Sequence, residues 1–335
     1  MAGPAVTFVV PNYNGARYLR ETLASILAQR DPDFLLIVAD NQSTDESLAI
    51  AGSFGDPRLS IARADSHVSM AENWNRALSL VRTPYGVLAH ADDIYEPEYL
   101  SDMRPLLEAY PDAFAAHCYV TNIDEQGVPQ RDLPVERYKH QFWPPGDTYC
   151  RPACDEARWL RRGNYILASS VIYRMTCVHA IGGFEPRFHF VTDWQYWLRG
   201  VFAGFRLAGT RRRLLRYRRH SGSGTKAAEE NLTRYGEEIE ILRWVAAQGF
   251  ATGCFSDARE EFGLVTNTLM SELADRLARG DRTGAARLAA YARERIPGYR
   301  GSPRDVAASA MLPLGALGGR ALGAVRELYL RAQAR

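Results

Sequence analysis

Residues 5–15 have the sequence AVTFVVPNYNG, an apolar and partly β-branched run that ends in a turn rich in asparagine. A short apolar run bounded by turn residues is typical of a buried β-strand. The residues that follow place Leu19, Leu23, Ile26 and Leu27 on one face of a helix. This strand, loop and helix predict the first unit of an α/β fold.

The alternation of strand and helix continues along the chain. Apolar runs at 34–39, 59–62 and 85–89 predict three further strands, and the intervening helices are predicted to begin at two capping boxes, Ser43–Glu46 and Ser69–Glu72. Strands that alternate with helices form mostly parallel sheets with covered faces, and ligands bind beyond the carboxyl ends of such strands. We therefore expect the chemistry of this protein in the loops that follow the strands.

The second half of the chain has a different pattern. Residues 112–149 contain shorter apolar stretches with proline and aromatic residues, which predict antiparallel strands and an irregular loop. A strand at 166–173 and a helix beginning at Asp193 are predicted next. After Thr225 the chain is predicted to be helical to its end.

The whole-chain composition is that of an ordinary globular protein: 335 residues, 46% hydrophobic, 24% charged, with a formal net charge of +2. So small a charge gives no reason to expect nucleic acid as a partner. The N-terminal apolar run is too short and too weakly charged at its start for a secretory signal, and no stretch reaches the ~18 apolar residues of a spanning helix. We expect a cytoplasmic protein.

Two adjacent carboxylates, Asp92 and Asp93, follow the predicted strand at 85–89. Neighbouring negative charges repel each other, and a hard divalent cation such as Mg²⁺ or Mn²⁺ relieves that repulsion while keeping positions open for phosphate oxygens. An alternative is that one carboxylate only caps the helix predicted to begin near Pro97. The position of the pair at a strand end favours the metal hypothesis.

Six short motifs occur in order along the chain. They are Val-Val-Pro-Asn-Tyr-Asn at 9–14, Asp-Asn-Gln-Ser-Thr-Asp at 40–45, Glu-Asn-Trp-Asn at 72–75, Ala-Asp-Asp at 91–93 with Pro97, Gly-Gly-Phe at 182–184, and Thr-Asp-Trp at 192–194. Each motif is weakly specific, but the ordered set resembles the family 2 glycosyltransferases of GT-A fold over roughly residues 4–225. The resemblance implies transfer of a sugar from a nucleoside diphosphate, with a metal that neutralises the charge on the departing diphosphate.

The resemblance implies donor-binding roles in the first half of the chain. Pro11 and Tyr13 are expected to flank the nucleobase, Asp40 to accept hydrogen bonds from it, and Asn73 to lie near the nucleotide. Further donor-site residues implied by the matched motifs are His90, Ala91, Asp93 and Gly183.

The same resemblance implies a metal site. Asp92 matches the last carboxylate of the family's Asp-x-Asp motif and is expected to be the direct ligand, with Asp93 beside it near the sugar. His90 stands where the family usually has aspartate. This change implies a weaker metal site, a preference for softer metals or only an altered contact with the ribose, unless His90 is a plain structural residue.

Asp193 is the expected catalytic base. An inverting transfer needs a carboxylate that takes the proton from the acceptor hydroxyl as that oxygen attacks the anomeric carbon. The family places this base at the head of a helix, where Asp193 is also a good N-cap, so both roles are compatible. Thr192 replaces an acidic residue that often precedes the base in relatives, which leaves one acceptor contact open.

His220 follows a run of basic residues near the end of the matched region. Several relatives have a histidine here that completes the metal coordination, so His220 is the third expected metal ligand beside Asp92 and Asp93; a solvated loop histidine is the alternative. The basic residues are Arg211, Arg212, Arg213, Arg216, Arg218 and Arg219. They are interpreted as contacts to the diphosphate, contacts to an anionic acceptor, or solvated side chains.

Acceptor contacts are expected from Ser169 and Ser170, in the predicted strand at 166–173, and from Trp194 beside the proposed base. The C-terminal segment places Leu314, Leu317, Ala321, Val325 and Leu328 at helical spacing, with arginines elsewhere around the helix. This pattern indicates either contact with an anionic membrane that carries a lipid-linked acceptor, or packing against the protein itself or a second subunit.

We therefore predict a GT-A domain at 1–225, in which residues 1–110 bind the nucleotide-sugar and residues 111–225 bind the acceptor, followed by a helical region at 226–335. The leading hypothesis is an inverting, Mn²⁺- or Mg²⁺-dependent hexosyl- or deoxyhexosyltransferase. It would use a UDP- or dTDP-sugar and a glycan, lipid-linked or small-molecule acceptor, in the biosynthesis of a surface polysaccharide or O-antigen or of a natural product. Peripheral contact with the inner face of the plasma membrane and a homodimer are compatible with the sequence.

Two alternatives remain at this stage. A degenerate member of the family would bind a nucleotide-sugar, or scaffold a partner, without turnover. A nucleotidyltransferase would normally have a glycine-rich loop with a basic residue after the first strand, and residues 11–15 have the sequence PNYNG instead.

Overall fold

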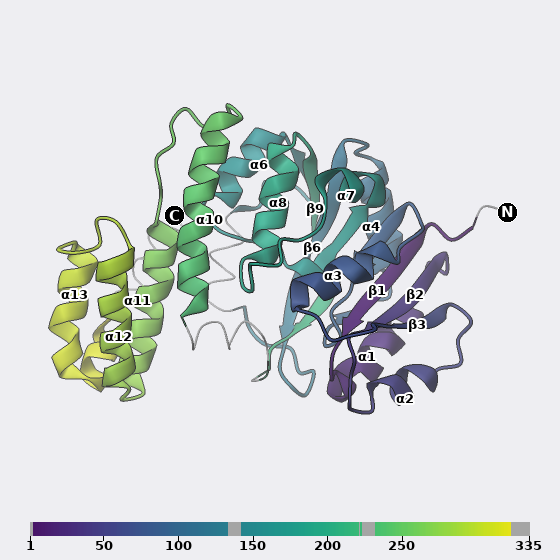
Figure 1. The fold of residues 1–335 in the computed structure, drawn as a ribbon, viewed down its shortest axis with the longest axis horizontal. Coiled ribbons are helices and arrows are strands. Elements are labelled where there is room, and N and C mark those ends of the chain that lie inside the picture. Colours follow the sequence, from purple (N-terminus) through teal and green to yellow (C-terminus); the bar gives the residue numbers. More distant parts are fainter. Residues whose placement is uncertain (1–2, 133–141, 221, 223–231, 323–335) are drawn as a thin grey trace. The chain divides into compact units, whose positions relative to one another are not determined.

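The computed structural model describes residues 3–132, 142–220, 222 and 232–322. The chain divides into two compact units, of which the first comprises residues 1–132, 144–160 and 164–227 and the second residues 133–143, 161–163 and 228–335. The first unit contains the β-sheet and the second is built from helices (Figure 1). The predicted α/β class and the helical C-terminal region are therefore both confirmed.

Within the described residues, nine strands form one sheet in the first unit, in the order β3-β2-β1-β4-β8-β6-β9-β5, with β7 paired to β9. The strands are β1 Val6–Asn12, β2 Phe34–Asp40, β3 Leu59–Arg63, β4 Tyr85–Leu88, β5 Ile94–Tyr95, β6 Ala113–Ile123, β7 Thr148–Arg151, β8 Val171–Arg174 and β9 Arg206–Arg218. Strands β1 to β4 run parallel, whereas β8 is antiparallel to both β4 and β6. The carboxyl ends of β1, β2 and β4 therefore lie at the same edge of the sheet, as the alternating pattern predicts.

Helices flank this sheet (Figure 1). In the first unit they are α1 Ala16–Leu27, α2 Ser47–Gly52, α3 Met70–Ser79, α4 Tyr99–Glu108, α6 Ala153–Leu160, α7 Met175–Ile181 and α8 Thr192–Phe202, with a 3₁₀ turn η2 at Ala168–Ser170. The second unit contains α10 Thr233–Ala251, α11 Gly263–Ala278, α12 Arg282–Arg295, α13 Pro303–Met311 and the 3₁₀ turn η3 Leu312–Leu314. None of the described helices combines the length and the apolar character that a membrane crossing requires.

The main core of the first unit includes side chains of β1, α1 and α4. The ring of Phe8 lies 5.5 Å from the rings of Phe34 and Tyr95 and 6.0 Å from that of Tyr99, measured between centroids. These separations are typical of aromatic pairs that stabilise a core. These aromatic contacts hold β1, the strand that leads into the first polar loop, in a fixed position.

Two predicted local features differ in the structure. The capping box Ser69–Glu72 is present at the start of α3, but α2 begins at Ser47 without a side-chain cap, because the Ser43 hydroxyl bonds to the loop after β1 instead. The strand predicted at 166–173 begins only at Val171, since Ala168–Ser170 form a 3₁₀ turn.

The C-terminal amphipathic pattern is only partly described. Leu314 and Leu317 are exposed, with 52% and 71% of their surface accessible. Val325 and Leu328 lie outside the described residues. The predicted membrane or subunit contact therefore stays a prediction.

Replacement of Gly200 by alanine should destabilise α8, the helix that carries Asp193. A Cβ atom at this position would lie 2.6 Å from the buried ring of Phe114. Overpacking typically costs about 1–3 kcal/mol, and the gain of about 1 kcal/mol in helix propensity offsets only part of it. We expect urea unfolding to show a loss of about 1–2 kcal/mol.

The matched control is Gly52→Ala, where nothing lies within 4 Å of the added methyl group. This variant should be at least as stable as the parent, because alanine is favoured over glycine within a helix by up to about 1 kcal/mol. Equal stability of both variants would show that the Phe114 ring adapts without cost.

Candidate active site

A cleft of about 620 Å³ lies at the carboxyl edge of the parallel strands. Its lining comes from the loop after β1, the loop after β4, the segment before α8 and the end of β9. The described residues that line it are Pro11, Tyr13, Asn14, Gly15, Arg17, Tyr18, Met70, Trp74, His90, Ala91, Asp92, Leu167, Ala168, His189, Phe190, Thr192, Asp193, Tyr217, His220 and Gly222. A volume of this size is typical of small-molecule sites.

The loops after β1 and β2 are joined by their polar side chains. Asn12 donates from Nδ2 to Asp40 Oδ1 at 3.2 Å and to the Ser43 hydroxyl at 3.0 Å. The same hydroxyl accepts the backbone N–H of Asn14 at 2.9 Å, and Asn14 Oδ1 accepts the N–H of Thr44. These bonds hold the first loop in one conformation, with Asn14 at a φ of 51°.

Gly15 is required by the same arrangement. A Cβ atom here would lie 2.3 Å from Asn12 Oδ1, the side chain that joins the two loops. Any larger residue would displace that side chain and, with it, the start of α1.

The buried position of Asp40 differs from its expected role at the nucleobase. Its side chain has no exposed surface, and it accepts bonds from Asn12 and from the backbone N–H of Ser43. Asp40 is not among the described residues that line the cleft. Its direct contacts are therefore to these loops and to Arg63 of β3, whose Nε lies 3.6 Å from Asp40 Oδ2.

Pro11 and Tyr13 do line the cleft, as expected. Tyr13 is 53% exposed, and its ring lies 4.3 Å from that of His67 between centroids. An exposed aromatic ring held by a neighbour offers a face on which another flat ring stacks.

Helix α3 presents Trp74, and not Asn73, to the cleft. The Trp74 ring stacks on His90 at a centroid separation of 5.2 Å and an interplanar angle of 29°. Asn73 instead accepts hydrogen bonds from Arg76, which ties α3 to the carbonyl of Asp40. Trp74 lies on the buried face of α3 together with Ala77 and Leu78, and only its neighbours in space show that it also lines the site.

Gly183 is not among the described residues that line the cleft, and its neighbour Phe184 binds Asn75. The Asn75 side chain accepts the N–H of Phe184 at 2.6 Å and donates to its carbonyl at 2.9 Å. A Cβ atom on Gly183 would approach Asn75 Oδ1 to 2.6 Å, so this turn requires glycine. Two motifs that are far apart in the sequence thus bind each other.

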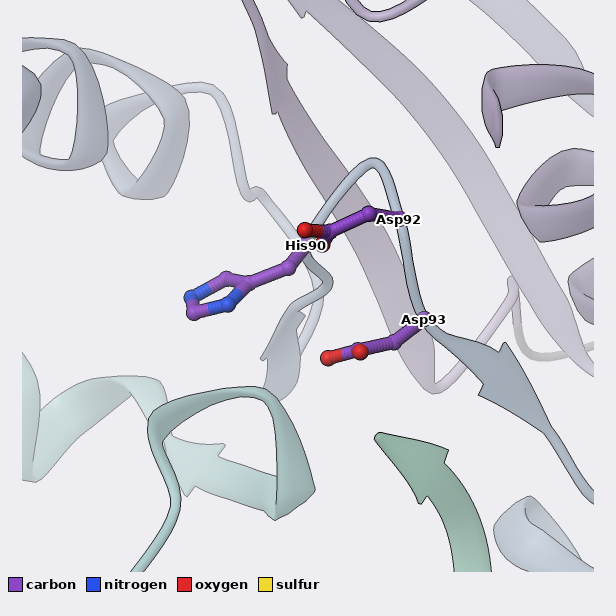
Figure 2. Close-up of side chains that lie close together, drawn as sticks. All are labelled: His90, Asp92 and Asp93. Atoms are coloured by element: carbon purple, nitrogen blue, oxygen red, sulfur yellow. The ribbon is translucent and has the colours of Figure 1, made fainter. Parts of the chain in front are cut away.

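His90, Asp92 and Asp93 form a cluster at the end of β4. One ligand atom from each residue lies within 4.8 Å of the others. In Figure 2 the three side chains project from one loop towards the same side. Such a group has the composition of a divalent metal site.

Asp93 is the buried member of this cluster. Its Oδ2 accepts the Ser169 hydroxyl at 2.5 Å, and its Oδ1 accepts the backbone N–H of Arg218 at 2.9 Å. Burial and the adjacent charge of Asp92 hold the pKa of Asp93 well above its ordinary value, although these bonds oppose the shift. Among the described residues, the cleft lining includes Ala91 and Asp92 but not Asp93.

Asp92 faces the cleft with 30% of its side chain exposed. Burial opposes its ionisation, but the hydrogen bond from His220 and the nearby His90 outweigh that effect, so the pKa of Asp92 lies below its ordinary value. His220 Nε2 lies 3.0 Å from Asp92 Oδ2. The structure thus brings together the residues expected to hold the metal.

Arg218 is a site residue whose inward orientation the sequence did not indicate. Its side chain has no exposed surface, and its guanidinium donates to the carbonyls of Asp92, Asp124 and Glu125 and to the carboxylate of Glu21. Burial of an arginine is favourable only where its donors are satisfied in this way. A run of six arginines gave no sign of which one turns inward.

The other five basic residues of this run, four in β9 and Arg219 directly after it, bind protein groups. Arg213 pairs with Asp132 at 2.7 Å, Arg216 pairs with Glu96 at 2.7 Å, and Arg212 pairs with Asp102. Arg211 and Arg219 donate to the Pro144 carbonyl and the Asn122 side chain. None of the six is among the described residues that line the cleft, which argues against direct contact with a diphosphate or an anionic acceptor.

Asp193 lines the cleft from the first turn of α8. The N-cap of α8 is Val191, so Asp193 is not the cap itself. Its Oδ1 accepts the N–H of Trp194 at 2.7 Å, and its Oδ2 accepts a bond from Asn164 at 3.0 Å. A carboxylate in the first turn of a helix is stabilised in its ionised form.

The residues expected at the acceptor lie behind the cleft surface. Ser169 bonds to Asp93, Ser170 donates to the carbonyl of Leu167, and Trp194 donates to the carbonyl of Leu160. All three are buried. Leu167 and Ala168 of the same segment line the cleft instead.

Comparison with protein families shows that residues 7–163 match the model described as glycosyl transferase family 2. An uncharacterized glycosyltransferase of Methanocaldococcus jannaschii is 29% identical over 143 residues, which are 42% of this chain and 49% of that protein. The succinoglycan biosynthesis protein ExoO of Rhizobium meliloti is 29% identical over 130 residues, which are 39% of this chain and 36% of that protein. The matched region thus spans about half or less of these relatives.

Among solved structures, the crystal structure of S. aureus TarS 1–349 in complex with UDP-GlcNAc is similar to this chain with a TM-score of 0.58 and 18% identity. The similarity covers 98% of this chain and 88% of that chain. At this identity the likeness shows the fold, which confirms the predicted GT-A-type architecture.

Replacement of Arg218 by methionine should destabilise the first unit strongly. Removal of one partner from a buried charged network typically costs about 3–5 kcal/mol. Arg213→Met is the matched control, because Arg213 is 38% exposed and an exposed pair contributes about 1 kcal/mol or less. Urea unfolding should separate the two variants, and equal midpoints would contradict the structural role of Arg218.

Proposed function

Residues 7–163 belong to glycosyltransferase family 2, and from this premise we propose that the protein transfers a sugar, with inversion, from a UDP- or dTDP-sugar to an acceptor hydroxyl. The observation that carries the proposal is that Asp92, from the loop after β4, and Asp193, from α8, line the same cleft. Asp92 would bind a cation that neutralises the departing diphosphate, and Asp193 would accept the proton of the attacking hydroxyl.

The donor nucleotide would bind at the loop after β1. Tyr13 offers an exposed ring face beside Pro11 for stacking of the base. The buried contacts of Asp40 and Asn73 support an indirect role, in which they hold the loop and α3 in place. UDP-GlcNAc in the similar TarS structure supports a uridine donor.

The residues at the end of β4 fit a divalent cation, and we assign Asp92 and His90 as its ligands, with His220 bonded to Asp92 beside them. The pKa of Asp92 lies below its ordinary value, the side chain faces the cleft, and His220 lies beside it. His90 Nε2 is buried and has no hydrogen-bond partner among the described residues, as expected for a nitrogen that would bind the cation. Mn²⁺ or Mg²⁺ bound here would neutralise the charge of the departing diphosphate.

Asp93 would have a different task. Both of its oxygens already accept hydrogen bonds from Ser169 and Arg218, and the side chain lies behind the cleft. We therefore propose that Asp93 fixes the loop that presents Asp92.

Asp193 would act as the general base. Its carboxylate would take the proton from the acceptor hydroxyl while that oxygen forms a bond to the anomeric carbon and the bond to the diphosphate breaks on the opposite face. Thr192 donates its hydroxyl to the carbonyl of Phe188, so it stabilises the turn before α8. Relatives usually have an acidic residue at this position, and its side chain would not make this hydrogen bond.

The acceptor is proposed to be the hydroxyl of a glycan, a lipid-linked saccharide or a small molecule. The similarity to ExoO, whose name refers to succinoglycan biosynthesis, supports a polysaccharide. Cytoplasmic action at the inner face of the plasma membrane, dimerisation and the division of the first 225 residues into donor and acceptor halves belong to the same proposal.

The proposal is tested by measuring the release of nucleoside diphosphate from a panel of UDP- and dTDP-sugars with Mn²⁺ and candidate acceptors. Asp193→Asn should lower kcat by about 10²–10⁴-fold, the usual contribution of a general base, without weakening donor binding. Asp92→Asn should instead weaken metal-dependent donor binding in calorimetry. Donor binding by the parent protein without turnover on any acceptor would favour the degenerate alternative, and unchanged kcat in Asp193→Asn would remove the assigned base.

His90→Asp, which restores the family's Asp-x-Asp motif, should shift metal preference from Mn²⁺ towards Mg²⁺. Carboxylate oxygen suits Mg²⁺ better than imidazole nitrogen does, and a change of ligand shell typically alters affinity by about tenfold or more. Melting temperatures measured with UDP across concentrations of each metal give the two affinities without turnover. An unchanged ratio of affinities would show that His90 is not a ligand.

A further inference from the structure

The proposed base, Asp193, is held by a side chain from a different segment of the first unit. Asn164, which lies between α6 and η2, donates from Nδ2 to Asp193 Oδ2 at 3.0 Å. We infer that Asn164 is a positioning residue that fixes the carboxylate of Asp193 in the orientation needed to accept a proton. The inference rests on the proposed function, because it assigns the task of Asn164 through that base.

The orientation of the Asn164 amide is determined by its second contact. Its Oδ1 accepts the backbone N–H of Ile166 at 3.1 Å, a turn in which the side chain binds the backbone two residues on. The oxygen is committed to that bond, so the NH₂ group must face Asp193. The hydrogen bond to the carboxylate therefore does not depend on an arbitrary choice between nitrogen and oxygen.

The choice of asparagine at this position is itself informative. Aspartate would form the turn with Ile166 equally well, because that contact requires only an acceptor oxygen. It would offer no donor to Asp193 and would place a second negative charge beside it. Among residues of this shape, asparagine combines the acceptor for the turn with a neutral donor for the carboxylate.

The two oxygens of Asp193 are constrained in different ways. Oδ1 accepts the N–H of Trp194 from its own helix, at 2.7 Å, whereas Oδ2 is held across the gap between segments by Asn164. The hydrogen bond within the helix fixes the side chain only relative to α8. The bond from Asn164 ties it to the segment between α6 and η2.

The segment that carries Asn164 is firmly anchored. Trp194 donates from Nε1 to the carbonyl of Leu160 at 2.9 Å, which joins α8 to the end of α6. Tyr95 donates its hydroxyl to the carbonyl of Ser169, and the Ser169 hydroxyl in turn binds Asp93. Residues 164–169 thus connect the proposed base, which Asn164 binds, with the carboxylate pair, which Ser169 binds. The separation of Asp193 from the pair is therefore set by one segment.

The test compares Asn164→Asp and Asn164→Ala with the parent in transfer assays. Misplacement of a reacting group by about 1 Å costs roughly 100-fold in rate, so kcat should fall by about that factor in both variants. KM for the donor should stay within about twofold of the parent, because Asn164 is not among the described residues that line the cleft. Asn164→Asp is decisive: parental kcat in this variant would show that Asn164 serves only the turn, and the inference would be wrong.

A double variant separates positioning from a general loss of structure. If Asn164 acts through Asp193, Asn164→Ala combined with Asp193→Asn should be no slower than Asp193→Asn alone. Additive losses would overturn the inference. The matched control is Asn267→Ala in α11, which removes one side-chain bond to Arg304 in the second unit and should leave kcat unchanged.

Crystal structures of the parent and of Asn164→Ala decide the inference without turnover. The Asp193 carboxylate should rotate away from its parental position once the bond is removed, and an unmoved carboxylate would contradict the inference. Failure of the parent protein to transfer sugar from any donor would refute the proposed function, and the position of Asp193 would still answer the question about Asn164.

Discussion

The buried carboxylate of Asp93 is the constraint on which the site depends. Ionisation of a carboxylate without solvent and beside a second carboxylate is unfavourable, which holds the pKa of Asp93 well above its ordinary value. Hydrogen bonds from the Ser169 hydroxyl and the backbone N–H of Arg218 offset part of that cost. The guanidinium of Arg218 then fills the space behind the pair and satisfies the Asp92 carbonyl. These contacts join β4, the segment before β8 and the end of β9, and they leave Asp92 facing the cleft.

Several polar residues of the six sequence motifs form hydrogen bonds with residues of other motifs. Asn12 and Ser43 join the loops after β1 and β2 by a hydrogen bond, and Asn75 forms two hydrogen bonds to the backbone of Phe184 in the turn after Gly183. Each contact satisfies a polar group that would otherwise be buried alone. These hydrogen bonds between the loops leave other side chains, such as Tyr13 and Asp193, facing the cleft, where they can contact a ligand. Short polar motifs in a sheet of this kind therefore hold the loops as much as they bind the ligand.

The parallel half of the fold was predictable because buried strands and amphipathic helices leave periodic signals. The strands ending at Asn12, Asp40 and Leu88 agree with the apolar runs, and the capping box at Ser69 agrees with its spacing. The capping box predicted at Ser43 was wrong, because the Ser43 hydroxyl accepts hydrogen bonds from Asn12 and Asn14 instead. Local spacing cannot reveal such competition, since the competing partner lies about 30 residues away.

The sequence by itself determined the α/β class and the edge of the sheet at which the polar loops lie, because strand order and loop position follow from local pattern. Its resemblance to the family 2 glycosyltransferases implied that Asp92, Asp193 and His220 share one site. Tertiary structure alone decided which polar residues face the cleft. It buries Asp40 and Asp93, turns Arg218 inward, and brings Asn164 to Asp193. These choices depend on how burial is balanced against hydrogen bonds from distant segments, and the spacing of residues along the chain carries no record of that balance.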